Sequence, residues 1–201
     1  MLYVDPALIA TATQDLTGRP SPLPFVADPV LDDAALRSAV VGAFRLPPEP
    51  LALDALVLRL AEGLIRHGAR GHVQHPPGRI DHLAIERGRA FLEQRLAVVR
   101  SEELEAITGL SRYEFARQFR TRHGTSPYRY SLARRLDHAR RRLHRGASLA
   151  DLALDAGFAD QAHLTRAFKA TFGLTPGRYA RLCGAPPASA SWPGAGTTAA
   201  T

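Results

Sequence analysis

At residues 157–169 the chain reads GFADQAHLTRAFK, and a related stretch at residues 108–120 reads TGLSRYEFARQFR. The two stretches match with an offset of 48 residues before the turn and 49 residues after it. The matched pairs are Leu104/Leu152, Gly109/Gly157, Leu110/Phe158, Phe115/Leu164, Arg117/Arg166, Phe119/Phe168, Arg120/Lys169, Gly124/Gly173, Ser126-Pro127/Thr175-Pro176 and Tyr130/Tyr179. Self-similarity of this kind indicates a duplicated structural unit.

Each copy has the outline of a helix-turn-helix: a short helix, a turn with glycine and a second helix. We expect these units at about residues 101–123 and 148–172, and a linking helix at 127–144. Helix starts are marked by the pattern Ser111-Arg112-Tyr113-Glu114, by Ser148, and by Ser126 and Thr175, which each precede a proline. No alternating strand pattern follows residue 82, so the fold class is predicted as mainly α.

The second helix of each copy has a polar or basic outer face opposite its buried aromatic residues. Phe115 and Phe119 are expected to face inward in the first copy, and Leu164, Phe168 and Phe172 in the second. The outer faces carry Tyr113, Ala116, Arg117 and Arg120 in the first copy, and Ala162, Thr165, Arg166 and Lys169 in the second, with Gln161 and His163 leading. Arg and Gln pair with guanine and adenine edges, whereas Arg, Lys and Thr hold phosphates. The alternative is a basic face that only contacts solvent. Two such faces, repeated in register, favour DNA binding over this alternative.

The linking helix is expected to bury Leu132, Leu136, Ala139 and Leu143. Its eighteen residues give a rod of about 27 Å, near the ~34 Å repeat of the major groove. We therefore predict that both units meet one face of a duplex in successive major grooves.

The segment 157–169, with Phe172-Gly173-Leu174-Thr175-Pro176 and Tyr179, resembles the signature of the AraC/XylS family of transcription regulators. The resemblance covers residues 82–182 and implies a sequence-specific transcription regulator that acts on RNA polymerase. Activation by recruiting the polymerase is the expected direction, and repression by blocking it stays open. It implies base-facing positions at Tyr113, Ala116, Arg117, Gln161, Ala162, His163 and Arg166, and phosphate contacts at Ser111, Arg112, Arg120, Thr165 and Lys169. The alternative is a basic helical module that binds nucleic acid non-specifically or an acidic protein partner.

Residues 1–75 are expected to be the remnant of a sensor and dimerisation region, followed by a linker at 76–81. A helical turn is possible at 6–10, and helices are expected near 32–44 and 51–67. The helix at 51–67 is apolar on more than one side, so we expect it to form the interface of a homodimer. Its apolar residues are Leu51, Leu53, Leu56, Val57, Leu58, Leu60, Leu64 and Ile65. Family members usually carry a β-barrel sensor, but this stretch has no strands to close one. A truncated regulator, a misplaced start and an effector-independent form stay open, and so does a small-molecule effector.

The net charge of +7 is unevenly distributed, because residues 1–75 carry −2 and residues 76–201 carry +9. This asymmetry favours a polyanionic partner for the second part. The single cysteine, Cys183, excludes a disulfide framework within the chain. With no signal peptide and no membrane span in the sequence, a cytoplasmic protein is expected.

Other chemistry has little support in the sequence. His67, His72, His75 and His82 could hold a metal, but exposed loop histidines without cysteine are the favoured interpretation, so no metal or cofactor is expected. Cys183 is interpreted as an inert thiol. Neither a GxSxG elbow nor a phosphate loop occurs, so the chain is not expected to be an enzyme. The tail, 183–201, is expected to be disordered.

Overall fold

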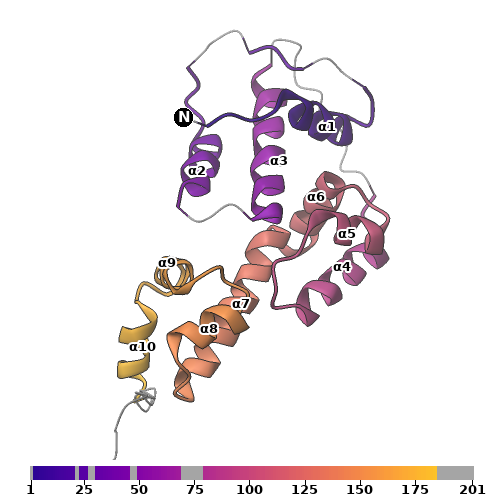
Figure 1. Cartoon of the computed structure of the whole chain (residues 1–201). Coiled ribbons are helices and arrows are strands. Elements are labelled where there is room, and N and C mark those ends of the chain that lie inside the picture. Colours follow the sequence, from indigo (N-terminus) through magenta and orange to yellow (C-terminus); the bar gives the residue numbers. More distant parts are fainter. Residues whose placement is uncertain (1, 21–22, 27–29, 46–48, 69–78, 185–201) are drawn as a thin grey trace, which may run out of the picture. The chain divides into compact units, whose positions relative to one another are not determined.

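The computed structural model describes residues 2–20, 23–26, 30–45, 49–68 and 79–184. These residues form ten helices and no strand (Figure 1), which confirms the mainly α prediction. The helices are α1 (Pro6–Thr17), α2 (Ala34–Ala43), α3 (Pro50–His67), α4 (His82–Gln94), α5 (Ser101–Thr108), α6 (Arg112–His123), α7 (Pro127–His144), α8 (Leu149–Asp155), α9 (Gln161–Phe172) and α10 (Pro176–Leu182). None of them is long and apolar enough to cross a membrane.

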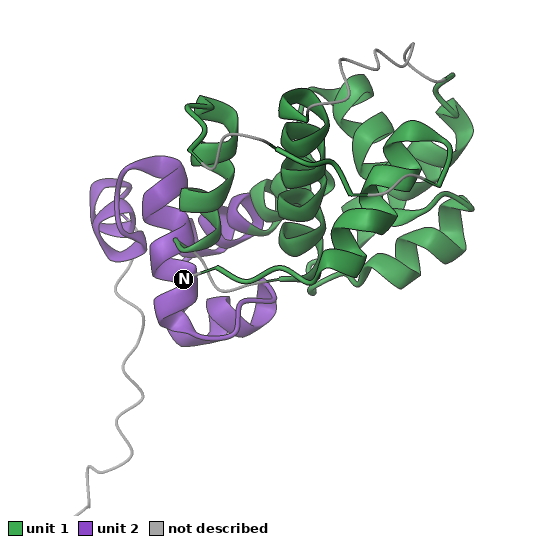
Figure 2. Ribbon diagram, turned by 90° about the horizontal axis from the view of Figure 1, so that it is seen from above, with its two compact units in different colours: residues 1–135 green, residues 136–201 purple. Residues whose placement is uncertain are grey.

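The chain folds into two compact units, residues 1–135 and 136–201, shown in green and purple in Figure 2. The boundary falls within α7, so the N-terminal helices and the first helix-turn-helix share one unit. The sequence had placed the division at the linker 76–81, of which 76–78 lie outside the described residues. Most of the tail, 185–201, lies outside them as well.

The expected helix starts are present as side-chain caps. Ser111, Ser126, Ser148 and Thr175 each accept a hydrogen bond from the backbone N–H three residues ahead. Their donors are Glu114 at 3.2 Å, Arg129 at 3.3 Å, Asp151 at 3.2 Å and Arg178 at 3.4 Å. Each such bond satisfies an N–H group that the first turn of a helix leaves without a partner. The Glu114 carboxylate accepts hydrogen bonds from Arg117 and Gln118 further along α6.

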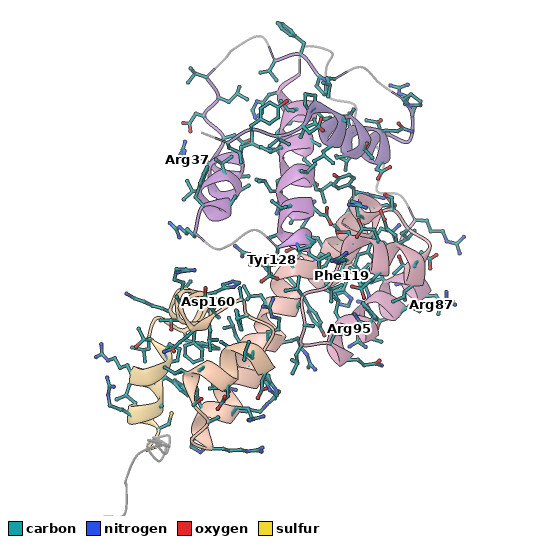
Figure 3. All side chains as sticks on the ribbon, viewed as in Figure 1. Arg37, Arg87, Arg95, Phe119, Tyr128 and Asp160 are labelled. Carbon is teal, nitrogen blue, oxygen red and sulfur yellow. The ribbon has the colours of Figure 1, made fainter. Side chains whose placement is uncertain are left out.

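The core of the first helix-turn-helix is built by α4, α5 and α6, with Leu51 of α3, around two aromatic residues of α6. Phe115 and Phe119 are fully buried, with ring centroids 5.4 Å apart. Tyr130, at the start of α7, packs edge-on against Phe119 at 5.5 Å. Figure 3 labels Phe119 among these side chains. The rest of the cluster is apolar: Leu51, Ile85, Leu92, Val99 and Leu104.

The second unit repeats this design around Phe168, which is fully buried. Its ring lies 4.5 Å from that of Phe172 and 5.6 Å from that of Tyr179. Phe172, which we expected to face inward, is 37% exposed, because it caps the edge of this cluster at the last turn of α9. The predicted stripe of the linking helix is confirmed, since Leu132, Leu136, Ala139 and Leu143 are all buried.

The duplicated turns are alike in detail. Gly109 and Gly157 follow the first helix of their units with φ of 71° and 69°. Residues with a Cβ reach this left-handed region only with strain, so glycine is needed at both places. The leucines that precede them, Leu104 and Leu152, are both fully buried. The repeat seen in the sequence is therefore a repeat of fold.

The N-terminal helices form a second cluster in the first unit. α1 is longer than the expected turn, and together with α2 and α6 it packs against α3. This packing covers the apolar sides of α3 within the chain. Of its residues that we expected to form a dimer surface, only Leu53 is exposed. The dimer remains a prediction, but the wide apolar surface from which it was inferred is mostly occupied.

Candidate nucleic-acid interface

The outer face of α9 is open to solvent. Asp160, labelled in Figure 3, begins the helix by accepting a hydrogen bond from the His163 N–H at 2.6 Å. Gly173 ends the helix. Gln161, Ala162, Arg166 and Lys169 are exposed, and Thr165 is half-buried. Ala162, Thr165, Arg166 and Lys169 are spaced i, i+3, i+4 and i+7, so they share one side of the helix, and Gln161 lies at its leading end.

His163 lies apart from this open face. Its side chain is 2% exposed, and its ring meets that of Phe158 edge-on at 5.1 Å. The sequence had grouped it with the base-facing residues. The structure instead places the imidazole in the interior of the second unit, so it does not extend the exposed face.

The equivalent face of α6 is covered. Every residue from 111 to 120 is buried or half-buried. Tyr113 and Ala116, at 2% and 6% exposure, belong to the cluster formed with α1 and α3. The other buried members of this cluster are Ile9, Ala12, Val57, Leu58 and Ala61. In this conformation the side chains of Tyr113 and Ala116 contact helices of their own chain and are closed to any ligand.

Polar residues of α6 and its cap contact acidic residues of the N-terminal helices. The Ser111 hydroxyl donates to Asp15 Oδ2 at 2.5 Å, and the Arg120 guanidinium donates to Glu62 of α3. Arg117 pairs within its own helix, with its Nη2 2.5 Å from Glu114 Oε1. The three cationic or polar groups therefore have partners inside the first unit.

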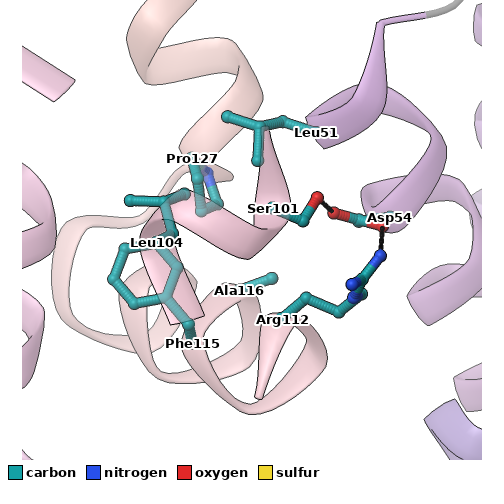
Figure 4. Close-up of a pocket in the computed structure, with 8 residues that line it drawn as sticks. All are labelled: Leu51, Asp54, Ser101, Leu104, Arg112, Phe115, Ala116 and Pro127. Carbon is teal, nitrogen blue, oxygen red and sulfur yellow. Dashed lines mark hydrogen bonds and ion pairs between the residues drawn. The ribbon is translucent and has the colours of Figure 1, made fainter. Parts of the chain in front are cut away.

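Arg112 lies at the centre of a larger acidic cluster beside a small pocket (Figure 4). Its Nη2 is 2.9 Å from Glu102 Oε1, its Nε 3.1 Å from Glu105 Oε1, and its Nη1 3.8 Å from Asp54 Oδ1. Asp54 of α3 also accepts from the Ser101 hydroxyl. The pocket is lined by Leu51, Asp54, Ser101, Leu104, Arg112, Phe115, Ala116 and Pro127.

Burial controls the protonation of this region. It raises the pKa of the Asp54 carboxyl above its ordinary 3.8, against the opposing effects of Ser101 and Arg112. Burial, with the nearby Asp54 charge, also raises the pKa of Tyr113 to about 12. The carboxylates around Arg112 raise the pKa of its guanidinium, so it stays charged. A neutral phenol and a fixed cation therefore occupy neighbouring positions in the first turn of α6.

A buried ion pair connects the N-terminal helices to α7, and our sequence reasoning missed it. Arg135 Nη1 donates to both carboxylate oxygens of Glu49, at 2.9 and 2.7 Å. The position of Arg135 could have indicated its burial. It lies next to Leu136 and three residues after Leu132, at the edge of the buried stripe. An arginine there needs an acidic partner, but nothing local in the sequence identifies Glu49.

The described residues contain no group of three potential metal ligands. His67 Nε2 lies 2.9 Å from Asp33 Oδ2, and the Asp33 carboxylate also caps α2. His72 and His75 of the histidine group lie outside the described residues.

The region that holds both helix-turn-helix copies is similar to known proteins. Residues 104–182 match the family model of a helix-turn-helix domain. The chain is 30% identical over 171 residues to the uncharacterized HTH-type transcriptional regulator YbfI of Bacillus subtilis (strain 168), covering 81% of this chain and 60% of that protein. It is 30% identical over 137 residues to the virulence regulon transcriptional activator VirF of Yersinia enterocolitica, covering 66% of this chain and 48% of the activator. The chain thus spans about half to three fifths of the length of these relatives.

A solved structure of a probable AraC family transcriptional regulator from Rhodopseudomonas palustris CGA009 aligns with half of this chain. The alignment covers 50% of this chain and 97% of that one, at 27% identity and a TM-score of 0.46.

Proposed function

Residues 104–182 of this chain are a helix-turn-helix domain of the AraC type, and from this premise we propose that the protein is a transcription regulator that reads specific sequences in double-stranded DNA. The observation that carries the proposal is the open face of α9. It presents an amide, a guanidinium and an ammonium group, on Gln161, Arg166 and Lys169, from one side of a helix. Those are groups that bind base edges and phosphates in a major groove.

The roles within this face follow from the chemistry of each group. Arg166 is suited to bidentate pairing with the O6 and N7 acceptors of guanine, and Gln161 to pairing with adenine. Ala162 offers only apolar contact, which suits a thymine methyl. Thr165 and Lys169 are proposed to hold phosphates, which would fix the position of the helix without reading sequence.

We assign the equivalent role in the first unit to α6, with Arg117 as its base-reading residue and Ser111, Arg112 and Arg120 as phosphate contacts. Support comes from the repeat, because α6 and α9 begin with side-chain caps and end with a left-handed glycine in the same way. The continuous helix α7 joins the units over a length of about 27 Å. Both units would then bind one duplex in successive major grooves.

The regulator is proposed to act on RNA polymerase at the promoter, in the cytoplasm. The name of the Yersinia relative, a transcriptional activator, supports activation over repression.

The test is a genome-wide selection of DNA fragments by the purified full chain at about 150 mM salt, where non-specific phosphate binding is weak. We expect the fragments to share a motif with two short elements about one helical turn apart. Fragments without a common motif, bound equally by wild type and Arg166→Ala, would indicate a basic module without sequence preference and would contradict the proposal.

A further inference from the structure

We propose that the N-terminal helices α1 and α3 inhibit DNA binding by the first helix-turn-helix, because they occupy the face of α6 that would enter the major groove. This inference rests on the proposed function and adds an intramolecular competitor for DNA. In the state described by the structure, α9 is ready to bind and α6 is not.

The apolar half of the contact covers Tyr113 and Ala116, which are 2% and 6% exposed. Tyr113 and Ala116 are buried against Ala12 of α1 and against Val57 and Ala61 of α3. A major groove is about 12 Å wide and admits one helix. DNA and the two covering helices therefore cannot occupy this face of α6 at the same time, so binding requires α1 and α3 to separate from it.

The polar half of the contact places carboxylates where phosphates would bind. Asp15 accepts from Ser111, Glu62 accepts from Arg120, and Asp54 lies 3.8 Å from Arg112. These are the three residues of the first unit assigned to phosphate contacts. Carboxylates and phosphates make the same charge-assisted hydrogen bonds to guanidinium and hydroxyl groups. Residues 1–75, with a net charge of −2, thus supply anions to a part of the chain with a net charge of +9.

The second unit shows that this cover is not a requirement of the fold. α9 has the same length as α6, begins like it with a side-chain cap and ends like it with a left-handed glycine. Yet Ala162, Arg166 and Lys169, which correspond to Tyr113, Arg117 and Arg120, are exposed. The cover on α6 is therefore an added feature of the N-terminal segment.

The energetic consequence is a reduced apparent affinity. If only a fraction of molecules has α6 uncovered, the apparent dissociation constant rises by the inverse of that fraction. A substitution in α1 or α3 that weakens the contact raises the fraction of molecules with α6 uncovered. DNA binding then becomes tighter, although no residue assigned to DNA has changed.

The experiment compares Glu62→Ala with Asp32→Ala in the full chain, using the most enriched fragment from the selection as the probe. Both changes remove one negative charge from the N-terminal segment. Glu62 pairs with Arg120, whereas Asp32 lies on the surface and pairs with Arg37. We expect Glu62→Ala to bind the fragment about three- to tenfold more tightly than Asp32→Ala, since tenfold corresponds to ~1.4 kcal/mol. Equal affinity of the two variants would overturn the inference.

Hydrogen exchange of the wild-type chain gives a second, independent readout. On binding the same fragment, amides of residues 6–17 and 50–67 should exchange faster because their helices lose their packing partner, while those of α9 should exchange more slowly. Unchanged or slower exchange in both N-terminal helices would contradict the inference. If instead no fragment is bound with sequence preference and Arg166→Ala changes nothing, the proposed function itself fails, which is a distinct result.

Discussion

Arg135 and Glu49 form an ion pair in the interior of the first unit, with two hydrogen bonds from one guanidinium nitrogen. The Arg135 side chain is 1% exposed. Glu49 directly precedes α3, and Arg135 lies in the middle of α7. The pair joins the start of α3 to α7, so it anchors the N-terminal helices beside the first helix-turn-helix at one point outside the face of α6.

Removing one partner of this pair should be strongly destabilising. Arg135→Met leaves the Glu49 carboxylate buried without its guanidinium, and we expect a loss of about 3–5 kcal/mol in the free energy of unfolding. The double variant Glu49→Leu/Arg135→Met should lose much less than the sum of the two single variants. Urea unfolding followed by circular dichroism measures all four proteins. Additive losses would show that the two side chains are not energetically coupled.

The open face of α9 predicts different effects for its two cations. Arg166→Ala should cost about 1–3 kcal/mol on the selected sequence and relax the preference at one base position. Lys169→Ala should weaken binding to all sequences alike and reduce the slope of log K against log salt by about one. Binding titrations at several salt concentrations, with matched and mismatched fragments, separate the two. A uniform loss for Arg166→Ala would reassign it to a phosphate.

Two glycines in helices predict opposite effects of alanine. A Cβ at Gly88 of α4 would collide with the ring of Phe115, which is buried and packed on Phe119, whereas a Cβ at Gly42 of α2 meets nothing within 4 Å. Gly88→Ala should therefore destabilise, because overpacking costs about 1–3 kcal/mol and outweighs a helix-propensity gain of about 1 kcal/mol. Gly42→Ala should stabilise by about 0.5–1 kcal/mol. Thermal unfolding of both variants checks the signs, and a stabilised Gly88→Ala would mean that the ring shifts freely.

The raised pKa of Asp54 predicts how stability depends on pH. Because burial raises this pKa, the folded state holds the proton more tightly than the unfolded chain, and the wild type loses stability as pH rises from the ordinary value of 3.8 through the folded value. Asp54→Asn keeps an acceptor for Ser101 and lacks this titration. Its stability relative to wild type should therefore increase with pH across that window and level off above it.

Melting temperatures of wild type and Asp54→Asn, measured from about pH 4 to 7, give this comparison. Asp32→Asn, at an exposed position, provides the control curve. A difference between Asp54→Asn and wild type that stays constant with pH would show that Asp54 titrates normally.

The repeat made the helix-turn-helix units predictable, because glycine turns and Ser or Thr caps are local signals. The start of α7 follows from Ser126-Pro127, and the burial of Leu136 and Leu143 follows from periodicity. The cover on α6 could not be predicted, since Ala12 and Ala61 look like ordinary helix residues and only tertiary contact places them on Tyr113. His163 was misplaced for a related reason. A residue in the first turn of α9 can face solvent or the interior, and the sequence pattern does not distinguish the two. The contact with Phe158 places the His163 ring in the interior.

The two copies of the unit are subject to different mutational constraints, although they share one fold. Tyr113 is enclosed by helices of its own chain, whereas Ala162, its counterpart in the second copy, faces solvent. If α9 binds the groove as proposed, a new side chain at position 162 changes the preferred base at little cost to folding, because the position is exposed. At position 113 the same exchange must also be accepted by α1 and α3. On the proposed function, the second copy is therefore freer to change its sequence preference by single substitutions, while the first would need a compensating change in the N-terminal helices.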